Sequence, residues 1–128
     1  MKLVAETNCY SLRIDENKHR VYITMSDVLH SPMDNFKYLF DLKTASQEMP
    51  KDFTVLADWT QVYKPLYRRE PIDWEIRNIF REAGVRKTAE IVALDVVTDS
   101  PMPYWEEVGI AGRAFADKVQ AEKWLDEG

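Results

Sequence analysis

The chain has 128 residues, a net charge of −5 and one cysteine, with 45% hydrophobic and 30% charged residues. This length fits a single domain, residues 1–128, which can bury about two-thirds of its unfolded surface. The negative charge argues against nucleic acid as a partner, and the lone Cys9 excludes an internal disulfide.

Residues 9–27 predict an antiparallel β-hairpin. In the stretch CYSLRID, apolar and polar residues alternate with the period of two that half-buried strands show. The stretch VYITMSD predicts the second strand, and Asp15 and Asn17 are available to form the turn between the two strands.

Residues 31–50 predict a helix with clear start and stop signals. Ser31 can cap the first turn, and Pro32 suits the first helical position because its missing N–H would have no partner there. Asp34 places a negative charge near the positive end of the helix dipole, and Pro50 ends the helix. The apolar face expected to pack on the sheet consists of Phe36, Leu39, Phe40, Leu42, Ala45 and Met49.

The rest of the chain alternates predicted strands and helices. The runs FTVLADW (53–59) and TAEIVALDVV (88–97) are typical of strands covered on both faces. Between them, residues 72–83 carry apolar side chains at helical spacing, and Gly84 follows as a stop signal. The remaining elements are a short helix in PYWEEVGIAG (103–112), a short strand in RAFAD (113–117), and a last helix capped by Asp117 with Ala121, Trp124 and Leu125 facing inward.

This order of elements predicts the fold class. Helices that alternate with strands usually connect parallel neighbours in one sheet. We therefore expect an α/β fold with a mixed, mostly parallel sheet, an N-terminal antiparallel hairpin and about four helices.

The sequence also bears on the location of the protein. No window reaches the run of about 18 apolar residues that spans a membrane. The first residues, MKLVAETNCYS, lack the apolar core of a signal peptide. We expect a cytoplasmic protein without membrane insertion.

Aromatic and basic residues gather after the first apolar run. Trp59, Tyr63 and Tyr67 recur every four residues, interleaved with basic residues that include Arg68 and Arg69. Aromatic residues and arginine are enriched at interface centres, and arginine stacks on aromatic faces. The stretch is either a loop pinned to the body by its own aromatic side chains or a surface for a partner or ligand.

Catalytic and metal-binding signals are weak. Asp58 and Asp95 lie at or near the carboxyl ends of predicted parallel strands, where open α/β sheets bind ligands. Such acids can share a site and act as an acid–base pair, or they can simply solvate strand ends. His19 and His30 lack a second ligand at a metal-binding spacing. Since no nucleophile or phosphate-loop motif is present either, we predict no metal, no cofactor and no catalytic residue.

Three stretches carry a resemblance to a known family: FTVLADW after a long capped helix, REAGVRKTAEIVAL, and RAFADKVQAEKWL. The most specific feature is the Phe-x-Asp…Ala-Glu-x-Trp-Leu arrangement in the last of them. With these stretches the chain resembles the SpoIIAA-like proteins, relatives of the STAS domain of anti-sigma-factor antagonists. The resemblance extends over residues 10–127, almost the whole chain.

The resemblance implies a compact mixed sheet with helices packed on it, and a protein that docks a partner without catalysing a reaction. In the best-known members the docking face includes the loop and helix after the central strand, which correspond to residues 58–81, and a phosphorylated serine there acts as a switch. No serine lies between Trp59 and Ile72 in this chain, where Thr60 is the only hydroxyl apart from tyrosines. The same broad fold is similar to some lipid-carrying domains, which implies a small-ligand alternative.

Two functional hypotheses follow. The first is a non-enzymatic regulatory module that docks a protein partner, or a second copy of itself, through the loop and helix after the central strand. The alternative is a carrier or sensor of a small apolar or anionic, lipid-like ligand in a pocket at the carboxyl edge of the sheet. The candidate partner- or ligand-binding residues are Asp58, Trp59, Thr60, Tyr63, Tyr67, Arg68, Arg69, Arg77, Asp95, Tyr104 and Trp105.

Overall fold

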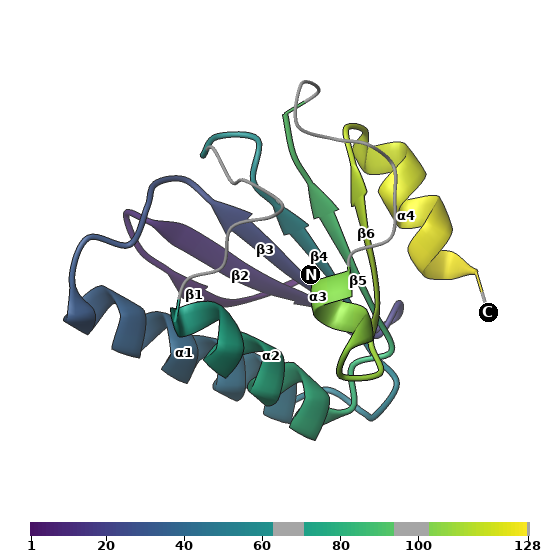
Figure 1. Cartoon of the computed structure of the whole chain (residues 1–128), viewed down its shortest axis with the longest axis horizontal. Coiled ribbons are helices and arrows are strands. Elements are labelled where there is room, and N and C mark those ends of the chain that lie inside the picture. The colour runs from purple at the N-terminus through teal and green to yellow at the C-terminus, as the bar shows by residue number, and fades with distance from the viewer. Residues whose placement is uncertain (63–70, 94–102, 128) are drawn as a thin grey trace.

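The computed structural model of the chain describes residues 1–62, 71–93 and 103–127. Within these residues, a six-stranded sheet with the order β1-β2-β3-β4-β5-β6 carries helices on both faces (Figure 1). The order of strands in the sheet equals their order in the chain, so each strand pairs with the one before it. The predicted α/β class with a mixed sheet is confirmed.

The N-terminal half of the sheet is antiparallel. β1 (Lys2–Glu6) pairs with β2 (Tyr10–Asp15), and β2 pairs with β3 (Arg20–Met25) across the predicted hairpin. At its turn, Asp15 Oδ1 accepts a hydrogen bond from the backbone N–H of Asn17 at 3.0 Å. The sequence does not predict β1, because this edge strand is largely exposed and lacks a clear alternation of apolar and polar residues.

The C-terminal half of the sheet is parallel. Its strands are β3, β4 (Thr54–Asp58), β5 (Lys87–Ile91) and β6 (Ala111–Phe115). The connections contain α1 (Pro32–Gln47), α2 (Pro71–Ala83) and the short α3 (Pro103–Glu106), and α4 (Lys118–Asp126) follows the last strand.

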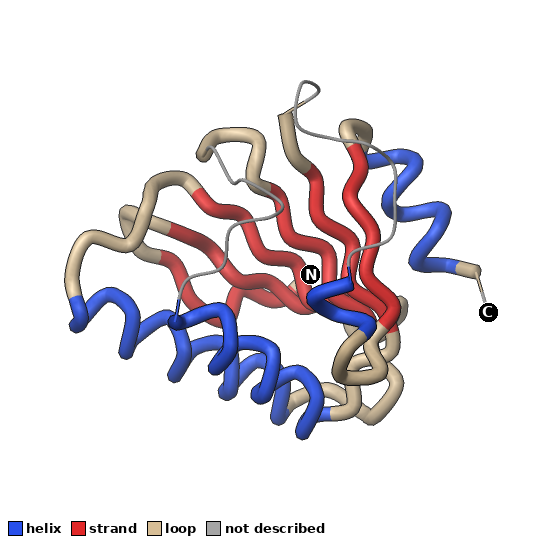
Figure 2. Tube along the Cα trace, in the orientation of Figure 1, coloured by secondary structure: helices blue, strands red, loops and turns tan. Residues whose placement is uncertain are grey.

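The helices form a layer on each face of the sheet. α1 and α2 lie side by side on one face, while α4 packs on the other face against β4, β5 and β6 (Figures 1 and 2). Parallel crossovers are right-handed, so connections that step across the sheet in one direction place their helices on the same face. No helix within the described ranges is long and apolar enough to cross a membrane.

Two apolar cores fill the space between the layers. The larger core lies under α1 and α2 and includes Leu12, Val21, Phe53, Val55 and Phe80. The smaller core, under α4, consists of Tyr22, Leu56, Ala89, Ile91, Phe115, Ala121 and Leu125. Because successive side chains of a strand point to opposite faces, each parallel strand contributes to both cores.

The buried face of α1 differs from the predicted one. Phe36 and Phe40 are 68% and 62% exposed, so the prediction is wrong for both residues. The residues that the helix buries are Tyr38, Asp41, Leu42, Ala45 and Ser46. Asp41 accepts hydrogen bonds from the Tyr10 hydroxyl at 2.6 Å and from Lys37 Nζ at 3.0 Å. The hydrogen bond to Tyr10 in a distant strand holds Asp41 against the sheet. The helix therefore buries the side that carries Asp41 and leaves its more apolar side exposed.

The predicted helix ends are confirmed. Ser31 Oγ accepts a hydrogen bond from the Asp34 N–H at 3.1 Å at the start of α1. Gly84 ends α2 with a φ of 87°, a left-handed conformation that glycine adopts without strain. Asp117 Oδ1 accepts from the Val119 N–H at 2.8 Å and caps α4.

Two predicted boundaries are wrong. The helix predicted over 103–112 ends at Glu106, and Ala111 and Gly112 belong to β6. A turn at Gly109, with a φ of 81°, separates the two elements. β5 ends at Ile91, before the end of the strand predicted over 88–97, the last part of which lies outside the described residues.

Buried Arg20 fastens α4 to the sheet. Its guanidinium donates to Asp126 Oδ1 at 2.8 Å, to Glu122, and to Thr54 Oγ1 at 2.8 Å. Burial and the hydrogen bond to Glu122 raise the pKa of the neighbouring Tyr22 to about 12, against the opposing effect of Arg20.

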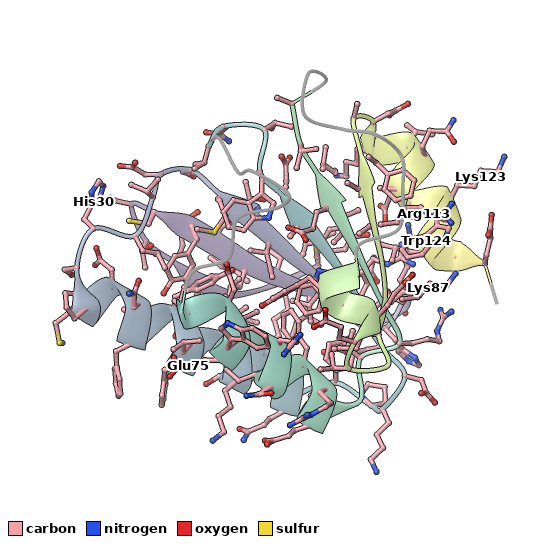
Figure 3. All side chains as sticks on the ribbon, viewed as in Figure 1. His30, Glu75, Lys87, Arg113, Lys123 and Trp124 are labelled. Atoms are coloured by element: carbon pink, nitrogen blue, oxygen red, sulfur yellow. The ribbon has the colours of Figure 1, made fainter. Side chains whose placement is uncertain are left out.

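Aromatic packing on the same side involves Trp124. Lys87 Nζ lies 4.7 Å from the centroid of the Trp124 ring, and the guanidinium of Arg113 lies 5.6 Å from it (Figure 3). The ring covers the edge of the smaller core next to Phe115. Cations therefore lie on an aromatic face in this part of the molecule.

Candidate ligand pocket between the sheet and α2

Strand β5 presents polar side chains to the larger core. Ala89 and Ile91 face α4, whereas Thr88 and Glu90 face the side of α1 and α2. Thr88 and Glu90 are each only 2% exposed. Strands covered on both faces are normally apolar throughout, so these two residues depart from the pattern of the rest of the core.

Glu90 places a carboxyl group inside the core. Trp105 Nε1 donates a hydrogen bond to Glu90 Oε2 at 3.1 Å. In the sheet, Glu90 lies between Ala57 of β4 and Ala114 of β6, whose small side chains leave room around it. A carboxylate is costly to bury unless it is paired and hydrogen-bonded, so Glu90 is a strong candidate for a functional residue.

Trp105 is held in place by close packing. Its ring stacks on Phe80 with 5.7 Å between centroids and meets the Tyr104 ring edge-on at 4.9 Å. A Cβ atom at Gly112 would lie 2.5 Å from Trp105 Cδ1. Glycine is therefore required at this position of β6 so that the indole can lie against the strand.

A cavity of about 30 Å³ is lined by Thr88 and Glu90. The other described residues that line it are Ile23, Tyr38, Val55, Ala57, Trp59, Asp73, Ile76, Phe80, Tyr104 and Trp105. A space of about 10–15 Å³ is enough for one water molecule. The cavity therefore admits a small head group, but it does not enclose a whole ligand of ordinary size.

The cavity offers oxygen atoms as hydrogen-bond acceptors. Thr88 Oγ1 is buried and has no hydrogen-bond partner among the described residues. Tyr38 is 3% exposed, and burial raises its pKa, with the nearby Glu90 raising it further. Its hydroxyl therefore keeps its proton and still has lone pairs to offer. Together with the carboxyl of Glu90, these groups make one side of the cavity polar.

The wall toward α2 is held together by Tyr104 and Arg77. The Tyr104 hydroxyl donates to the backbone carbonyl of Asp73. The guanidinium of Arg77 lies 3.9 Å from the centroid of the Trp74 ring and donates to Glu107 Oε2 at 2.9 Å. It also donates to the Tyr104 carbonyl at 3.2 Å, so this buried arginine stabilises the contact between α3 and α2.

The structure brings together Trp59, Tyr104 and Trp105 of the predicted site, since all of them line the cavity. Asp58 has a different environment: its Oδ1 accepts from the N–H of Thr60 at 2.9 Å and from its hydroxyl at 2.7 Å. This pair forms a turn at the end of β4. The predicted residues Tyr63, Tyr67, Arg68, Arg69 and Asp95 lie outside the described residues.

Sequence reasoning missed Thr88, Glu90 and Tyr38. A signal was present for Glu90, because a glutamate inside the apolar run TAEIVAL breaks the pattern of a strand covered on both faces. Tyr38 had no such signal. It comes from the helix whose buried face the local sequence does not reveal.

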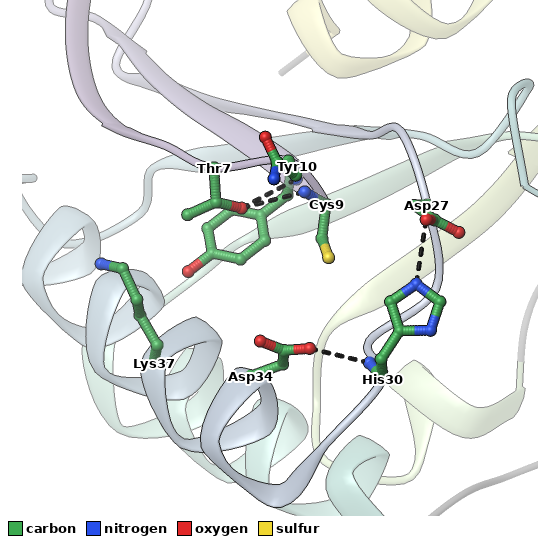
Figure 4. A pocket seen from close by; sticks show the side chains of 8 residues that line it. Thr7, Cys9, Tyr10, Asp27, His30, Asp34 and Lys37 are labelled. Atoms are coloured by element: carbon green, nitrogen blue, oxygen red, sulfur yellow. Dashed lines mark hydrogen bonds and ion pairs between the residues drawn. The ribbon is translucent and has the colours of Figure 1, made fainter.

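A larger cleft of about 450 Å³ lies at the start of α1 (Figure 4). Its polar side chains already bind one another or the backbone: His30 Nε2 lies 2.9 Å from Asp27 Oδ2, and Asp34 Oδ2 accepts from the His30 N–H at 2.9 Å. Burial raises the pKa of the Cys9 thiol in this cleft, and Asp34 and Asp27 raise it further, which disfavours a reactive thiolate. The cleft is therefore the weaker candidate.

The outer surface of α1 and α2 carries exposed apolar side chains. Met33, Phe36 and Phe40 follow one stripe of α1 and are 74%, 68% and 62% exposed, and Trp74 of α2 is 44% exposed. We call these four residues the α1–α2 apolar face. Exposed apolar side chains that gather along one stripe, as on α1, often mark an interaction site.

Comparisons with known proteins do not identify the chain. No family model, curated protein or solved structure matches it. In the part of the chain that the structure describes, no group of three or more His, Cys, Asp and Glu side chains is placed to hold a metal ion. The function must therefore be inferred from the geometry of the pocket and the surface.

Proposed function

We propose that this protein is a non-enzymatic binding module that takes the head group of a small ligand into the cavity beside Glu90. The observation that carries the proposal is the buried hydroxyl of Thr88, which has no hydrogen-bond partner among the described residues and lines a cavity in an apolar core together with the carboxyl group of Glu90. A buried polar group without a partner destabilises a fold. A bound head group would supply the missing hydrogen bond.

The position of the cavity supports the same proposal. Trp59 directly follows β4, and Glu90 is the last residue but one of β5. The cavity therefore lies near the carboxyl ends of neighbouring parallel strands, where open α/β sheets bind ligands. Trp59, Tyr104 and Trp105 line it, as the small-ligand hypothesis expects.

The lining combines a polar group with aromatic ones. Thr88 Oγ1 has no hydrogen-bond partner among the described residues, and a hydroxyl can donate or accept a hydrogen bond. The rings of Trp59, Tyr104 and Trp105 line the same space. A small ligand with one polar atom next to an apolar part fits this lining.

The test is an NMR titration with fragments that differ only in head group: an amine, an amide, an alcohol and a carboxylate on the same short alkyl chain. The indole N–H of Trp105 reports on the cavity, and the indole N–H of Trp124 on the other face serves as an internal control. At least one fragment is expected to shift the Trp105 signal and leave that of Trp124 unchanged. If every fragment leaves Trp105 unchanged, the cavity is not a binding site.

A second candidate function is protein docking through the α1–α2 apolar face. The SpoIIAA-like resemblance implies docking through residues 58–81, and of this face only Trp74 belongs to that region. The occupant that the surface fits is a second copy of the chain. An antiparallel pairing of two α1 helices brings Met33 of each copy to Phe40 of the other. In the same register, the Phe36 side chains of the two copies lie near each other at the centre of the contact.

Sedimentation velocity over a range of protein concentrations tests this second candidate. The double substitution Phe36→Ser with Phe40→Ser is expected to abolish a dimer that the original chain forms. Val119 of α4 is 70% exposed on the opposite side, so Val119→Ser is the matched control and leaves the dimer intact. A monomer at every concentration would exclude self-association through this face.

A further inference from the structure

We infer that the surface between α4 and the edge strand β6 binds a phosphate group through Lys87 and Arg113, beside the ring of Trp124. We call these three residues the α4–β6 basic patch. The inference is independent of the proposed function, because the patch and the cavity that Thr88 lines are on opposite faces of the sheet.

The sheet places the two cations as neighbours. Lys87 of β5 pairs with Ala111 of β6, and Arg113 is two residues further along β6. Residues two apart in a strand point to the same face, so both side chains lie on the face that α4 covers. Both reach one ring: Lys87 Nζ lies 4.7 Å and the Arg113 guanidinium 5.6 Å from the centroid of Trp124 (Figure 3).

Positive charge gathers at this patch. Among the residues that the structure describes, neither Lys87 nor Arg113 forms an ion pair with Asp or Glu. Burial lowers the pKa of Lys87, and the positive charge of Arg86 lowers it further. Arg113 and Arg20 act in the same direction, whereas the negative charge of Glu127 opposes them. An anion bound here would relieve the repulsion among these cations.

Hydrogen-bond donors remain available on both cations. Lys87 Nζ donates to the backbone carbonyls of Trp124 at 2.8 Å and Glu127 at 3.1 Å. These two bonds fix the position of the ammonium group and leave its third N–H for a ligand. The guanidinium of Arg113 has five N–H donors, and within the described ranges it contacts the Trp124 ring without donating to another residue.

The Trp124 ring holds the cations in place before a ligand arrives. The ring packs on Phe115 with 5.7 Å between centroids, so it is itself anchored to the smaller core. Cations are attracted to the face of an indole ring. Two cations that are already positioned lose less conformational freedom on binding, which favours affinity for an anion.

Two fixed cations favour a phosphate group over a carboxylate. A phosphate monoester carries a charge of about −1.5 to −2 at pH 7 and three acceptor oxygens, whereas a carboxylate carries one charge. The planar fork of an arginine binds two oxygens of a phosphate at once. The remaining N–H of Lys87 can donate to the third oxygen. The patch therefore matches both the charge and the number of acceptors of a phosphate group.

An NMR titration at constant ionic strength tests the inference with inorganic phosphate, phenyl phosphate and benzoate. The Trp124 indole N–H reports on the patch, and the Trp105 indole N–H on the other face is the internal control. Both phosphates should shift Trp124 at concentrations at least about tenfold lower than benzoate, which has the same ring as phenyl phosphate but one charge. Tighter binding of phenyl phosphate than of inorganic phosphate would identify a phosphate ester as the ligand, and equal binding would identify free phosphate.

Variants connect the binding to the named residues. Arg113→Gln removes the guanidinium and is expected to weaken phosphate binding by about tenfold or more. Lys123→Gln is the matched control, because it removes one positive charge next to Trp124 in the chain from an exposed side chain that points away from the sheet (Figure 3). It should change binding by less than about twofold.

Circular dichroism checks that each variant is folded. Should Arg113→Gln fail to fold, Arg113→Lys keeps the charge but loses the planar fork, and it should still weaken binding several-fold.

Three outcomes would overturn the inference. Benzoate binding as tightly as phenyl phosphate would show that the patch does not select phosphate. Equal weakening in Arg113→Gln and Lys123→Gln would show a diffuse electrostatic effect without a site. A Trp124 signal that no phosphate shifts would show that the patch binds none. None of these results bears on the cavity beside Glu90, which the Trp105 signal reports separately.

Discussion

The two faces of strand β5 differ in what they bury. Toward α4 the strand presents Ala89 and Ile91, which join a small apolar core. Toward α2 it presents Thr88 and Glu90, which line a cavity. Because neighbouring residues of one strand serve these two purposes, the apolar face can stabilise the fold while the polar face departs from the rules of core packing.

The two faces also satisfy their polar groups differently. On the α4 side, the buried guanidinium of Arg20 has hydrogen bonds to Glu122, Asp126 and Thr54. On the α2 side, Thr88 Oγ1 has no partner within the described ranges. A satisfied polar network rigidifies a fold, whereas an unsatisfied group is suited to a ligand. Substitutions on the two faces should therefore have opposite effects.

The largest effect is expected from Ile91→Glu, which places a carboxyl group on the apolar face. Ile91 is 3% exposed, and its neighbours on that face of the sheet are Asp58 of β4 and Phe115 of β6, neither of which is basic. An unpaired charge buried in this way destabilises the fold by about 3–5 kcal/mol. Urea denaturation measures the change, and Glu90→Gln in the same strand is the matched control with a much smaller effect. Equal losses in the two variants would show that the faces are equivalent.

A smaller loss is expected from Gly112→Ala. The new Cβ would lie 2.5 Å from Trp105 Cδ1, so the indole must move. Overpacking of this kind costs about 1–3 kcal/mol, and the Trp105 indole N–H signal should shift as its bond to Glu90 changes. Gly109→Ala is the control: it introduces strain at a φ of 81° but meets no atom within 4 Å, so it should leave that signal in place. An unshifted Trp105 signal in Gly112→Ala would contradict the packing argument.

Thr88→Val is expected to raise stability by about 1 kcal/mol, because it keeps the shape of the side chain and removes a buried hydroxyl that has no partner in the described part of the chain. The same change at Thr54 should lower stability by about 1 kcal/mol, since Thr54 Oγ1 accepts a hydrogen bond from Arg20 at 2.8 Å. Thermal unfolding of both variants gives the comparison directly. A loss of stability in Thr88→Val would mean that the hydroxyl has a structural partner.

The smallest effect concerns acid stability. The hydrogen bond from Arg20 lowers the pKa of Asp126 below its ordinary value. A carboxyl group with a lowered pKa stabilises the fold above its unfolded pKa, near 3.9, and this contribution is lost as the pH falls through the lowered value. Since Asp126 is 57% exposed, solvent screening keeps the effect small.

Asp126→Asn should therefore show a flatter dependence of unfolding free energy on pH below about pH 4 than the original chain. Glu75→Gln, on the exposed surface of α2 on the other face of the sheet, provides a carboxyl control. An unchanged acid dependence in Asp126→Asn would mean that the contact with Arg20 does not persist in solution.

Local signals in the sequence predicted much of the fold. The caps at Ser31 and Asp117, the stop at Gly84 and the apolar runs of β4 and β5 each depend on a few neighbouring residues. These features predicted the order of the elements and the α/β class. The predicted boundary between α3 and β6 was wrong because the observed one depends on the packing of Trp105 on Gly112. The pattern of neighbouring residues does not reveal this contact.

The buried face of α1 shows the same limit. The helix buries Tyr38 and Asp41 and exposes Phe36 and Phe40. This orientation depends on the hydrogen bond from Tyr10, in a distant strand, to Asp41. For the candidate site, the aromatic residues Trp59, Tyr104 and Trp105 were predicted from composition and position. Glu90 was not, although its presence in an apolar run was visible in the sequence.

The order of the strands has a consequence for how the chain folds. Each strand from β2 onward pairs with the strand that precedes it in the sequence, so the sheet can grow from one edge as the ribosome releases the chain. The two antiparallel pairs close short loops, which favours their rapid formation, whereas each parallel pair encloses a longer connection. The contacts of Arg20 with α4 join residues more than 100 positions apart. Docking of α4 on the sheet should therefore be a late step in the folding of the domain.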